Sequence, residues 1–274
     1  MCILGAVFVD HVVVERLTNF IWIGGDPYDD DKLKSVTRIL ASLGTGIAEL
    51  EEFYKNLKHD SQQDPQRFFP FIRHYSVGEH VLRFSYRDYL VPKTPSMALF
   101  RATEIESRRE IVVKFAQRYN AEAHRLLASA DRAPKLLYCS TEDPNPPELA
   151  GLIMVVMTYI DGKTAYQQYG NQELSQPIFD QVEEALGTLH ASNMVFGDLR
   201  NPNIMITKDE RVLLIDFDWC GVHEEHTYPV SLNDAPNMFN SINWHPDVKR
   251  GGRMMKEHDT FMLERMKPRP WSCR

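Results

Sequence analysis

The fold is decided by one loop-forming stretch, Phe196-Gly197-Asp198-Leu199-Arg200-Asn201-Pro202-Asn203-Ile204. Asp198 stands five residues before Asn203, and on a tight loop this spacing directs a carboxylate and an amide into one pocket. An aspartate can accept the proton of an attacking hydroxyl, and an asparagine oxygen can bind Mg²⁺. The alternative is a polar turn built on Asn-Pro-Asn that has no function.

A second acidic segment follows in Leu213-Leu214-Ile215-Asp216-Phe217-Asp218-Trp219. Asp216 ends an apolar run that is typical of a strand. A carboxylate at the end of such a strand is well placed for a metal beside a triphosphate. The alternative is a carboxylate that caps the following turn.

Lys114 stands alone in the apolar run Ile111-Val112-Val113-Lys114-Phe115. A lysine in a buried strand costs several kcal/mol unless it is paired. We expect its partner on the following helix, where Glu122 is the best candidate. The alternative is an edge-strand lysine whose ammonium reaches solvent.

Asp259 lies in Lys256-Glu257-His258-Asp259-Thr260-Phe261-Met262-Leu263, where it is an acid inside an otherwise apolar predicted helix. An acid in this setting is expected to accept hydrogen bonds from the backbone of a loop. The alternative is a solvated helix face.

The rest of the chain shows strand patterns first and helix patterns later. We predict five strands within 80–86, 97–103, 110–115, 135–138 and 152–159, with a helix at 120–128 whose inner face holds Ala121, Leu126 and Leu127. A helix over 174–192 with Ile178, Val182, Leu186 and Leu189 on one face, a hairpin of 204–206 with 212–215, and a last helix over 256–266 follow.

The N-terminal part carries two further patterns. Residues 1–9 are apolar and predict a strand or a buried helix, with a signal core as the alternative. Between Asp30 and Leu57 apolar residues recur at steps of three and four, and Gly44 and Gly46 could divide this segment into two helices. We expect an amphipathic helix that packs on the body of the protein. A coiled coil that binds a partner is the alternative, although the heptads are few.

Composition narrows the class of protein. The 274 residues are 43% hydrophobic and 25% charged, which excludes a mainly disordered chain, and the net charge of −7 argues against nucleic-acid binding. The four cysteines, Cys2, Cys139, Cys220 and Cys273, show no zinc spacing and indicate a reduced intracellular protein. No apolar run reaches the roughly 18 residues that span a bilayer. We therefore expect no membrane attachment and a cytoplasmic or nuclear location.

Taken together, these segments resemble the protein-kinase-like superfamily of protein kinases and aminoglycoside- or choline-type kinases. Residues 111–114 resemble the Val-Ala-Ile-Lys strand, 197–203 the catalytic loop, and 216–218 the Asp-Phe-Gly motif, which begins 18 residues after Asp198. The details are most similar to a fungal-specific family of kinase-like proteins. That similarity rests on 196–200, 215–221, Trp244-His245-Pro246-Asp247-Val248 and Glu257-His258-Asp259, and it covers about Arg67 to Met266.

The resemblance implies an α+β, two-lobed fold. A five-stranded antiparallel sheet with one helix would form the N-terminal lobe (67–160), and a mainly helical part would form the C-terminal lobe (161–274). Residues 1–66 would be a helical N-terminal extension with a possible partner of its own. The chain ends at Arg274 soon after the last helix, so we expect a short, truncated C-terminal lobe.

The resemblance also implies ATP and Mg²⁺ as ligands and assigns a role to each matching residue. Lys114 would hold the α- and β-phosphates, and Glu122 would steer it. Met157 would be the gatekeeper, and the backbone of Thr158 and Ile160 would bind the adenine edge. Asp198 would be the catalytic base, Arg200 a cation near the γ-phosphate, and Asn203 and Asp216 the Mg²⁺ ligands.

Three departures from the kinase pattern keep other functions open. The predicted turn at 91–96 has no glycine, Phe196-Gly197 replaces His-Arg, and Asp218 replaces the glycine of Asp-Phe-Gly. Without that arginine, we expect no activation by loop phosphorylation. The first hypothesis is a phosphotransferase acting on a hydroxyl, with Ser/Thr of a protein as the first guess. The alternatives are a pseudokinase that acts as a binding scaffold and a small-molecule kinase.

Overall fold

The computed structural model describes residues 2–8, 12–21, 29–56, 69–90, 98–149, 151–232 and 242–268. The chain divides into two compact units. The smaller comprises residues 1–72 with 148–151, and the larger comprises residues 73–147 with 152–274. Each unit is described by itself below.

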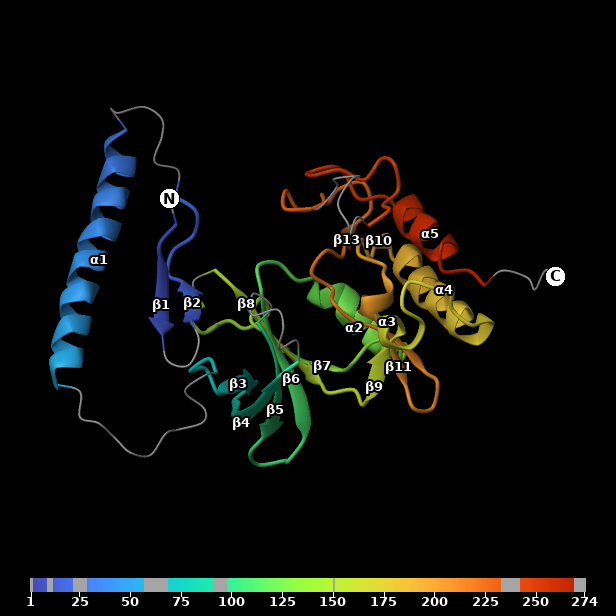
Figure 1. Cartoon of the computed structure of the whole chain (residues 1–274), viewed down its shortest axis with the longest axis horizontal. Helices are drawn as coiled ribbons and strands as arrows, with labels where there is room; N and C mark the ends of the chain where they lie inside the picture. The colour runs from blue at the N-terminus through green and yellow to red at the C-terminus, as the bar shows by residue number, and fades with distance from the viewer. Residues whose placement is uncertain are drawn as a thin grey trace. The chain divides into compact units, whose positions relative to one another are not determined.

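The smaller unit contains a hairpin and one long helix (Figure 1). Strands β1 (Leu4–Phe8) and β2 (Val12–Arg16) pair antiparallel, which confirms a strand in the apolar first segment. The N-terminal extension, expected to be helical, thus contains a hairpin as well as a helix. Helix α1 (Asp30–Asn56) is continuous through Gly44 and Gly46, and none of its residues is buried.

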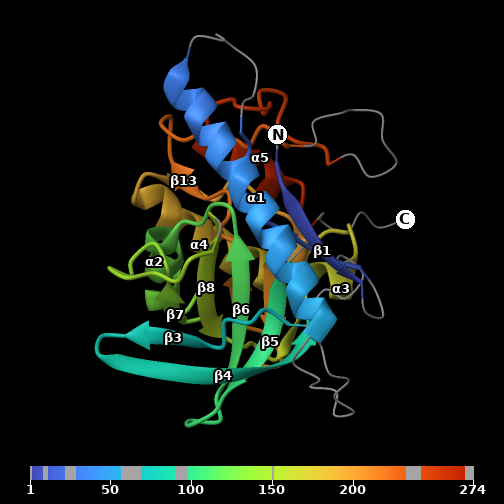
Figure 2. The ribbon, with the colours of Figure 1, turned by 90° about the vertical axis from the view of Figure 1, so that its left-hand side faces the viewer.

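The larger unit is α+β and contains a six-stranded antiparallel sheet in the order β3-β4-β5-β6-β8-β7. Figure 2 shows β6 within the sheet and the hairpin of β3 and β4 at its edge. The strands are β3 (His74–Val77), β4 (His80–Tyr89), β5 (Leu99–Glu104), β6 (Glu110–Ala116), β7 (Leu136–Cys139) and β8 (Ile153–Thr158).

The sheet has one strand more than predicted, because β3 was missed. This strand has four residues and only one buried side chain, Tyr75, so its sequence carries little alternation. Gly78, with φ of +60°, makes the tight turn to β4. The Tyr75 hydroxyl donates a 2.5 Å hydrogen bond to the buried carboxylate of Glu104 on β5, and this bond fixes β3 across the sheet.

Helix α2 (Ala121–Ser129) follows β6 and is capped by Asn120, whose side chain accepts a 2.9 Å hydrogen bond from the Ala123 amide. The helix buries Ala121, Ala123, His124 and Leu127. Leu126, which was predicted on the inner face, is only half-buried.

The rest of the larger unit is less helical than predicted. Its helices are α3 (Ala165–Tyr169), α4 (Gln176–Ala191) and α5 (Lys256–Glu264). Its short strands are β9 (Gly162–Thr164), β10 (Met194–Val195), β11 (Ile204–Thr207), β12 (Val212–Leu214) and β13 (Gly221–Val222). Long irregular segments take the remaining residues, so the expectation of a mainly helical region after Asp161 is wrong.

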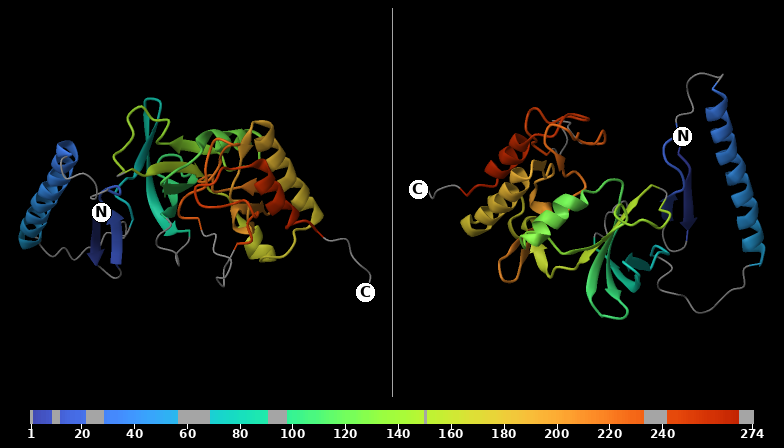
Figure 3. Two further views of the ribbon diagram at one scale, coloured as in Figure 1. Left: turned by 90° about the horizontal axis from the view of Figure 1, so that it is seen from above. Right: turned by 180° about the vertical axis from the view of Figure 1, so that it is seen from behind.

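The core of this region is built around α4. Its predicted inner face, Ile178, Val182, Leu186 and Leu189, is buried as expected. Helix α5 lies beside α4 (Figure 3). The predicted hairpin of β11 and β12 is confirmed, and β9 pairs with β11 to make a three-stranded sheet. The loop 196–203 connects β10, which follows α4, to this hairpin.

Among the described helices, none is both long and apolar enough to cross a bilayer.

Candidate functional site

Lys114 is buried on β6, and its ammonium is held by two carboxylates. Its Nζ lies 2.7 Å from Oδ1 of Asp216 and 2.6 Å from Oδ1 of Asp218. The Tyr119 ring lies beside the same ammonium, with its centroid 5.7 Å away. The structure thus brings together two segments about a hundred residues apart in the chain. The buried lysine needs these oppositely charged partners, because an unpaired charge is costly away from water.

The predicted pairing of Lys114 with Glu122 is wrong. Glu122 is exposed on the first turn of α2, and its side chain makes no hydrogen bond or ion pair with the residues that the structure describes. The two aspartates after β12 occupy the ammonium instead. Sequence spacing alone could not show that the loop after β12 reaches β6 more closely than the helix that follows it.

Lys114, Asp216 and Asp218 shift one another's pKa values. Burial opposes the charged form of Asp216, but the Lys114 ammonium outweighs it and holds the pKa of this carboxyl below its ordinary value. Burial and the repulsion of Asp216 raise the pKa of Asp218 to about 7. Asp216 also has a φ of +71°, a left-handed conformation that a non-glycine residue rarely adopts. Such strained positions are often found at functional sites.

Asp198 lies buried on the loop after β10 and is surrounded by donors. Arg200 donates two hydrogen bonds to its carboxylate, of 2.5 Å from Nε and 2.6 Å from a terminal nitrogen. Nδ2 of Asn203 donates 2.9 Å bonds to the Asp198 carboxylate and to its backbone carbonyl. Burial raises the pKa of Asp198 to about 6 in spite of the Arg200 cation.

The loop of Asp198 and the segment of Asp216 meet in space. The Ile215 amide donates a 3.0 Å hydrogen bond to the carbonyl of Asn203. The charge of Asp216 acts on both Asp198 and Arg200, raising the pKa of each. Lys114, Asp198, Arg200, Asn203 and Asp216 therefore form one cluster, whereas Glu122 does not join it.

Asp259 of α5 anchors this loop from beneath. Its carboxylate accepts hydrogen bonds from the amides of Phe196 (2.7 Å) and Gly197 (2.8 Å) and from Nε2 of His190 (3.1 Å). Asp259 is 1% exposed, so the predicted backbone hydrogen bonding is confirmed and the solvated face is excluded. Gly197 has a φ of +80°, and an added Cβ there would collide with Met254.

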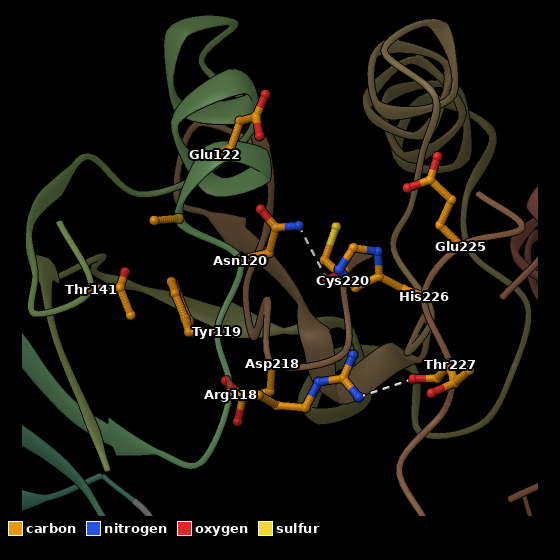
Figure 4. A pocket seen from close by; sticks show the side chains of 11 residues that line it. Arg118, Tyr119, Asn120, Glu122, Thr141, Asp218, Cys220, Glu225, His226 and Thr227 are labelled. Atoms are coloured by element: carbon orange, nitrogen blue, oxygen red, sulfur yellow. Dashed lines mark hydrogen bonds between the residues drawn. The ribbon is translucent and has the colours of Figure 1, made fainter. Parts of the chain in front are cut away.

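Helix α2 grips the segment after Asp216 through residues that the sequence did not single out. The backbone amide of Asn120 donates to the carbonyl of Phe217 (3.1 Å). Its side-chain Nδ2 donates to the carbonyl of Cys220 (3.2 Å), as Figure 4 shows. The His124 ring stacks on Phe217 with centroids 4.6 Å apart and planes 6° apart. No sequence motif predicts these contacts. An asparagine just before the first turn of a helix is a common N-cap, however, and this marks Asn120 as a structural residue.

His124 is held neutral in this stack. Its Nε2 lies 2.7 Å from the carbonyl of Pro134, which only accepts, so Nε2 carries the proton. Its Nδ1 then accepts from the Tyr119 hydroxyl at 2.6 Å. Burial lowers the pKa of His124 to about 4. The ring is therefore an uncharged packing partner of Phe217 at neutral pH.

Two variants distinguish the observed contacts of Asn120 from the predicted contact of Glu122. We expect Asn120→Ala to lower the free energy of unfolding by about 1–3 kcal/mol, because it removes a helix cap and leaves the carbonyl of the buried Cys220 without its side-chain donor. Glu122→Ala should change it by less than about 0.5 kcal/mol, as for an exposed residue without partners. Urea unfolding of both variants measures this, and equal losses would contradict the assignment.

The positions expected to face adenine are on β8 and just after it. Met157 is buried in the sheet. The Thr158 amide already donates to the carbonyl of Lys135 (3.0 Å), so it is not free to bind a ligand. Within the described residues, the backbone of Ile160 makes no hydrogen bond, and it remains available. The glycine-free turn at 91–96 lies outside the described residues.

A pocket of about 570 Å³ opens next to this cluster (Figure 4). It lies between the start of α2 and the segments after Asp218. Of Lys114, Asp216 and Asp218, Asp218 alone lines it. Nη1 of Arg118 donates to the carbonyl of Thr227 (3.0 Å) across one side. In the described part of the chain, no group of three or more His, Cys, Asp or Glu side chains forms a metal site.

Comparison with known proteins shows a distant likeness to kinases. No protein-family model matches the chain. It is 32% identical over 92 residues to the mouse sperm motility kinase Tcr mutant form, covering 30% of this chain and 19% of that protein. It is 34% identical over 70 residues to mouse sperm motility kinase 1, covering 24% and 14%.

The matched region is kinase-like, and the α+β larger unit with its antiparallel sheet is compatible with a kinase-like fold. The match spans less than a fifth of the length of either relative.

Proposed function

We propose that the chain is an ATP- and Mg²⁺-dependent phosphotransferase that transfers the γ-phosphoryl group to a hydroxyl. The observation that carries this proposal is the cluster of Lys114, Asp198, Asn203 and Asp216, which come from β6, the loop before β11 and the end of β12. A cation for phosphates, a buried carboxylate base and two oxygen ligands for a metal are the groups that phosphoryl transfer needs. In this proposal the site lies in a cleft between two lobes.

The donor set suits Mg²⁺. Asp216 offers a carboxylate whose pKa is held low, so it is ionised at neutral pH. Asn203 donates through Nδ2 to Asp198, which leaves its Oδ1 without a hydrogen bond from the described residues. Mg²⁺ prefers such oxygens and keeps few protein ligands beside phosphates. When bound, it would neutralise charge on the β- and γ-phosphates.

Asp198 would take the proton of the acceptor hydroxyl. The hydroxyl oxygen then bonds to the γ-phosphorus, the bond from that phosphorus to the bridging oxygen breaks, and ADP leaves. Arg200 must release part of its contact with Asp198 to face the γ-phosphate. Lys114 must likewise turn from Asp218 towards the phosphates, while its link to Asp216 keeps the metal ligand in place.

The acceptor is proposed by analogy alone. A Ser/Thr side chain of a protein is the first choice, in keeping with the kinase-named relatives. A small-molecule hydroxyl is the alternative, because Gly197 precedes the base as in small-molecule kinases. We further propose membership of the fungal-specific kinase-like family and a cytoplasmic or nuclear site of action.

One observation favours a second candidate, a pseudokinase that acts as a binding module. The Lys114 ammonium is held by two carboxylates, and the Asp198 carboxylate is closed by Arg200. The contact of Lys114 with Asp218 and part of the contact of Arg200 with Asp198 must open before a nucleotide and an acceptor can be used. A protein with these pairs permanently closed would bind partners without transferring phosphate.

An acceptor screen tests these proposals. The protein is incubated with ATP, labelled at the γ-phosphate, and Mg²⁺, together with basic protein substrates, amino alcohols and aminoglycosides. Label on a protein supports the first choice, and label on a small molecule supports the alternative. ATP binding with no labelled product and no ADP release would favour the binding module.

The pH dependence of transfer follows from Asp198. The base must be ionised, and its pKa is raised to about 6. We therefore expect kcat/KM to fall about tenfold per pH unit below pH 6 and to level off above it. Removing the nearby cation with Arg200→Gln should move this limb to higher pH. Since the pKa of Asp218 is about 7, Asp218→Asn is the control, and the limb near pH 6 should persist in it.

A further inference from the structure

Helix α1 exposes a row of large apolar side chains. Leu33, Leu40, Ile47, Leu50, Phe53 and Tyr54 are 49–61% exposed, and none of the residues of the helix is buried. Gly44 and Gly46 stand near its middle, and each costs roughly 1 kcal/mol of helix stability relative to alanine. Because most helices in proteins are stabilised by packing of an apolar face, this helix needs a cover for its own.

The spacing of the row shows what kind of cover fits. Apolar residues stand at positions 33, 36, 40, 43, 47, 50 and 54, in steps that alternate between three and four without interruption. This period of 3.5 residues is the a and d pattern of a left-handed coiled coil. We call this row of apolar residues, from Leu33 to Tyr54, the seam. The element that covers the seam is therefore another helix.

We propose that α1 forms an antiparallel coiled coil with α1 of a second copy of this chain. The seam is self-complementary when residue n faces residue 90 − n of the other copy. Leu40 then faces Leu50, and Leu43 faces Ile47, so each a position meets a d position. Beside the seam, Ile39 meets Phe53, which widens the apolar contact. Antiparallel pairing also sets the two helix dipoles head to tail.

The two glycines fit this arrangement. At Gly44 and at Gly46, an added Cβ would touch nothing within 4 Å among the described residues, and φ is not positive at either. Nothing described in the chain itself therefore calls for glycine there. In the proposed register both glycines lie next to the two-fold axis, and Gly44 of one copy lies level with Gly46 of the other. The absence of side chains there allows the two helices to approach closely.

Charge favours the antiparallel direction over the parallel one. Residues 30–38 carry Asp30, Asp31, Lys32, Lys34 and Arg38, a net charge of +1, whereas residues 49–55 carry Glu49, Glu51, Glu52 and Lys55, a net charge of −2. In the proposed register Arg38 of one helix lies level with Glu52 of the other. Parallel pairing would place each group beside its like.

The mass of the full chain in solution tests the pairing. We expect sedimentation equilibrium between 1 and 50 µM to give twice the mass of the chain. Leu40→Asp, in the seam, should return the protein to a monomer. The matched control is Thr45→Asp, on the opposite face of the helix, which should remain a dimer. Far-UV circular dichroism and the melting temperature of the larger unit show that both variants are folded.

The direction of pairing is tested by distance. Spin labels at Lys34→Cys, with Cys2 and Cys273 changed to serine, should lie more than about 30 Å apart, because 22 residues separate the two positions along antiparallel axes at 1.5 Å each. Gly46→Ala should weaken the dimer at least tenfold although alanine favours helix. A monomer at 50 µM, a dimer that survives Leu40→Asp, or labels within about 20 Å would overturn the proposal.

Discussion

Replacing Asp259 with alanine should lower the free energy of unfolding of the larger unit by about 3–5 kcal/mol. The carboxylate is buried and accepts two amide hydrogen bonds from Phe196 and Gly197 and one from His190. Its removal leaves two buried amides without an acceptor, and each costs about 1–3 kcal/mol, to which the cavity adds. Urea unfolding followed by tryptophan fluorescence measures the loss.

The conservative variant Asp259→Asn separates the hydrogen bonds from the volume of the side chain. It keeps one carbonyl oxygen and nearly the same size, but its amide nitrogen faces a donor. We expect a loss between those of wild type and alanine. If Asp259→Ala lost less than about 1 kcal/mol, the anchoring of the loop by α5 would be incorrect.

Replacing Asp198 with asparagine should lower kcat for phosphoryl transfer by about 10²–10⁴-fold, the range for loss of a general base. The affinity for Mg²⁺-ATP should change little, because the proposed phosphate and metal groups are Lys114, Asn203 and Asp216. The measurement is single-turnover transfer to whichever acceptor the screen identifies, with nucleotide binding measured separately.

The matched control is Asp209→Asn, an exposed acid in the turn between β11 and β12 that pairs with Arg211. It should keep both transfer and nucleotide affinity. A full rate in Asp198→Asn would remove Asp198 from the chemistry, and loss of nucleotide affinity alone would assign it to binding.

Local patterns predicted those parts of the fold that depend on near neighbours in the chain. Strands β4 to β8, helix α4 and the hairpin of β11 and β12 follow from apolar spacing, and the placement of Asp259 follows from an acid in a buried helix. The short edge strand β3 could not be predicted, because one buried tyrosine sets no period. The continuity of α1 through two glycines also could not be predicted, since propensity argues against it.

The candidate site was predictable as a set of residues but not as a set of contacts. Lys114, Asp198, Asn203 and Asp216 stand out by type and spacing. The partner of Lys114 depends on how two distant segments pack, and Glu122 seemed nearer only along the chain. The contacts of Asn120 and His124 with Phe217 and Cys220 are backbone and ring contacts, which leave no mark in a sequence.

The stability of the full chain with ATP, with and without Mg²⁺, tests the central claim most directly. Ligand at about 100 times Kd stabilises a protein by roughly 2.7 kcal/mol, which raises Tm by roughly 5–10 °C for a unit of this size. We predict a Mg²⁺-dependent rise in wild type and in Asp209→Asn, and none in Asp216→Asn. No rise in wild type at millimolar Mg²⁺-ATP, or an equal rise in Asp216→Asn, would contradict a nucleotide site built on Lys114 and Asp216.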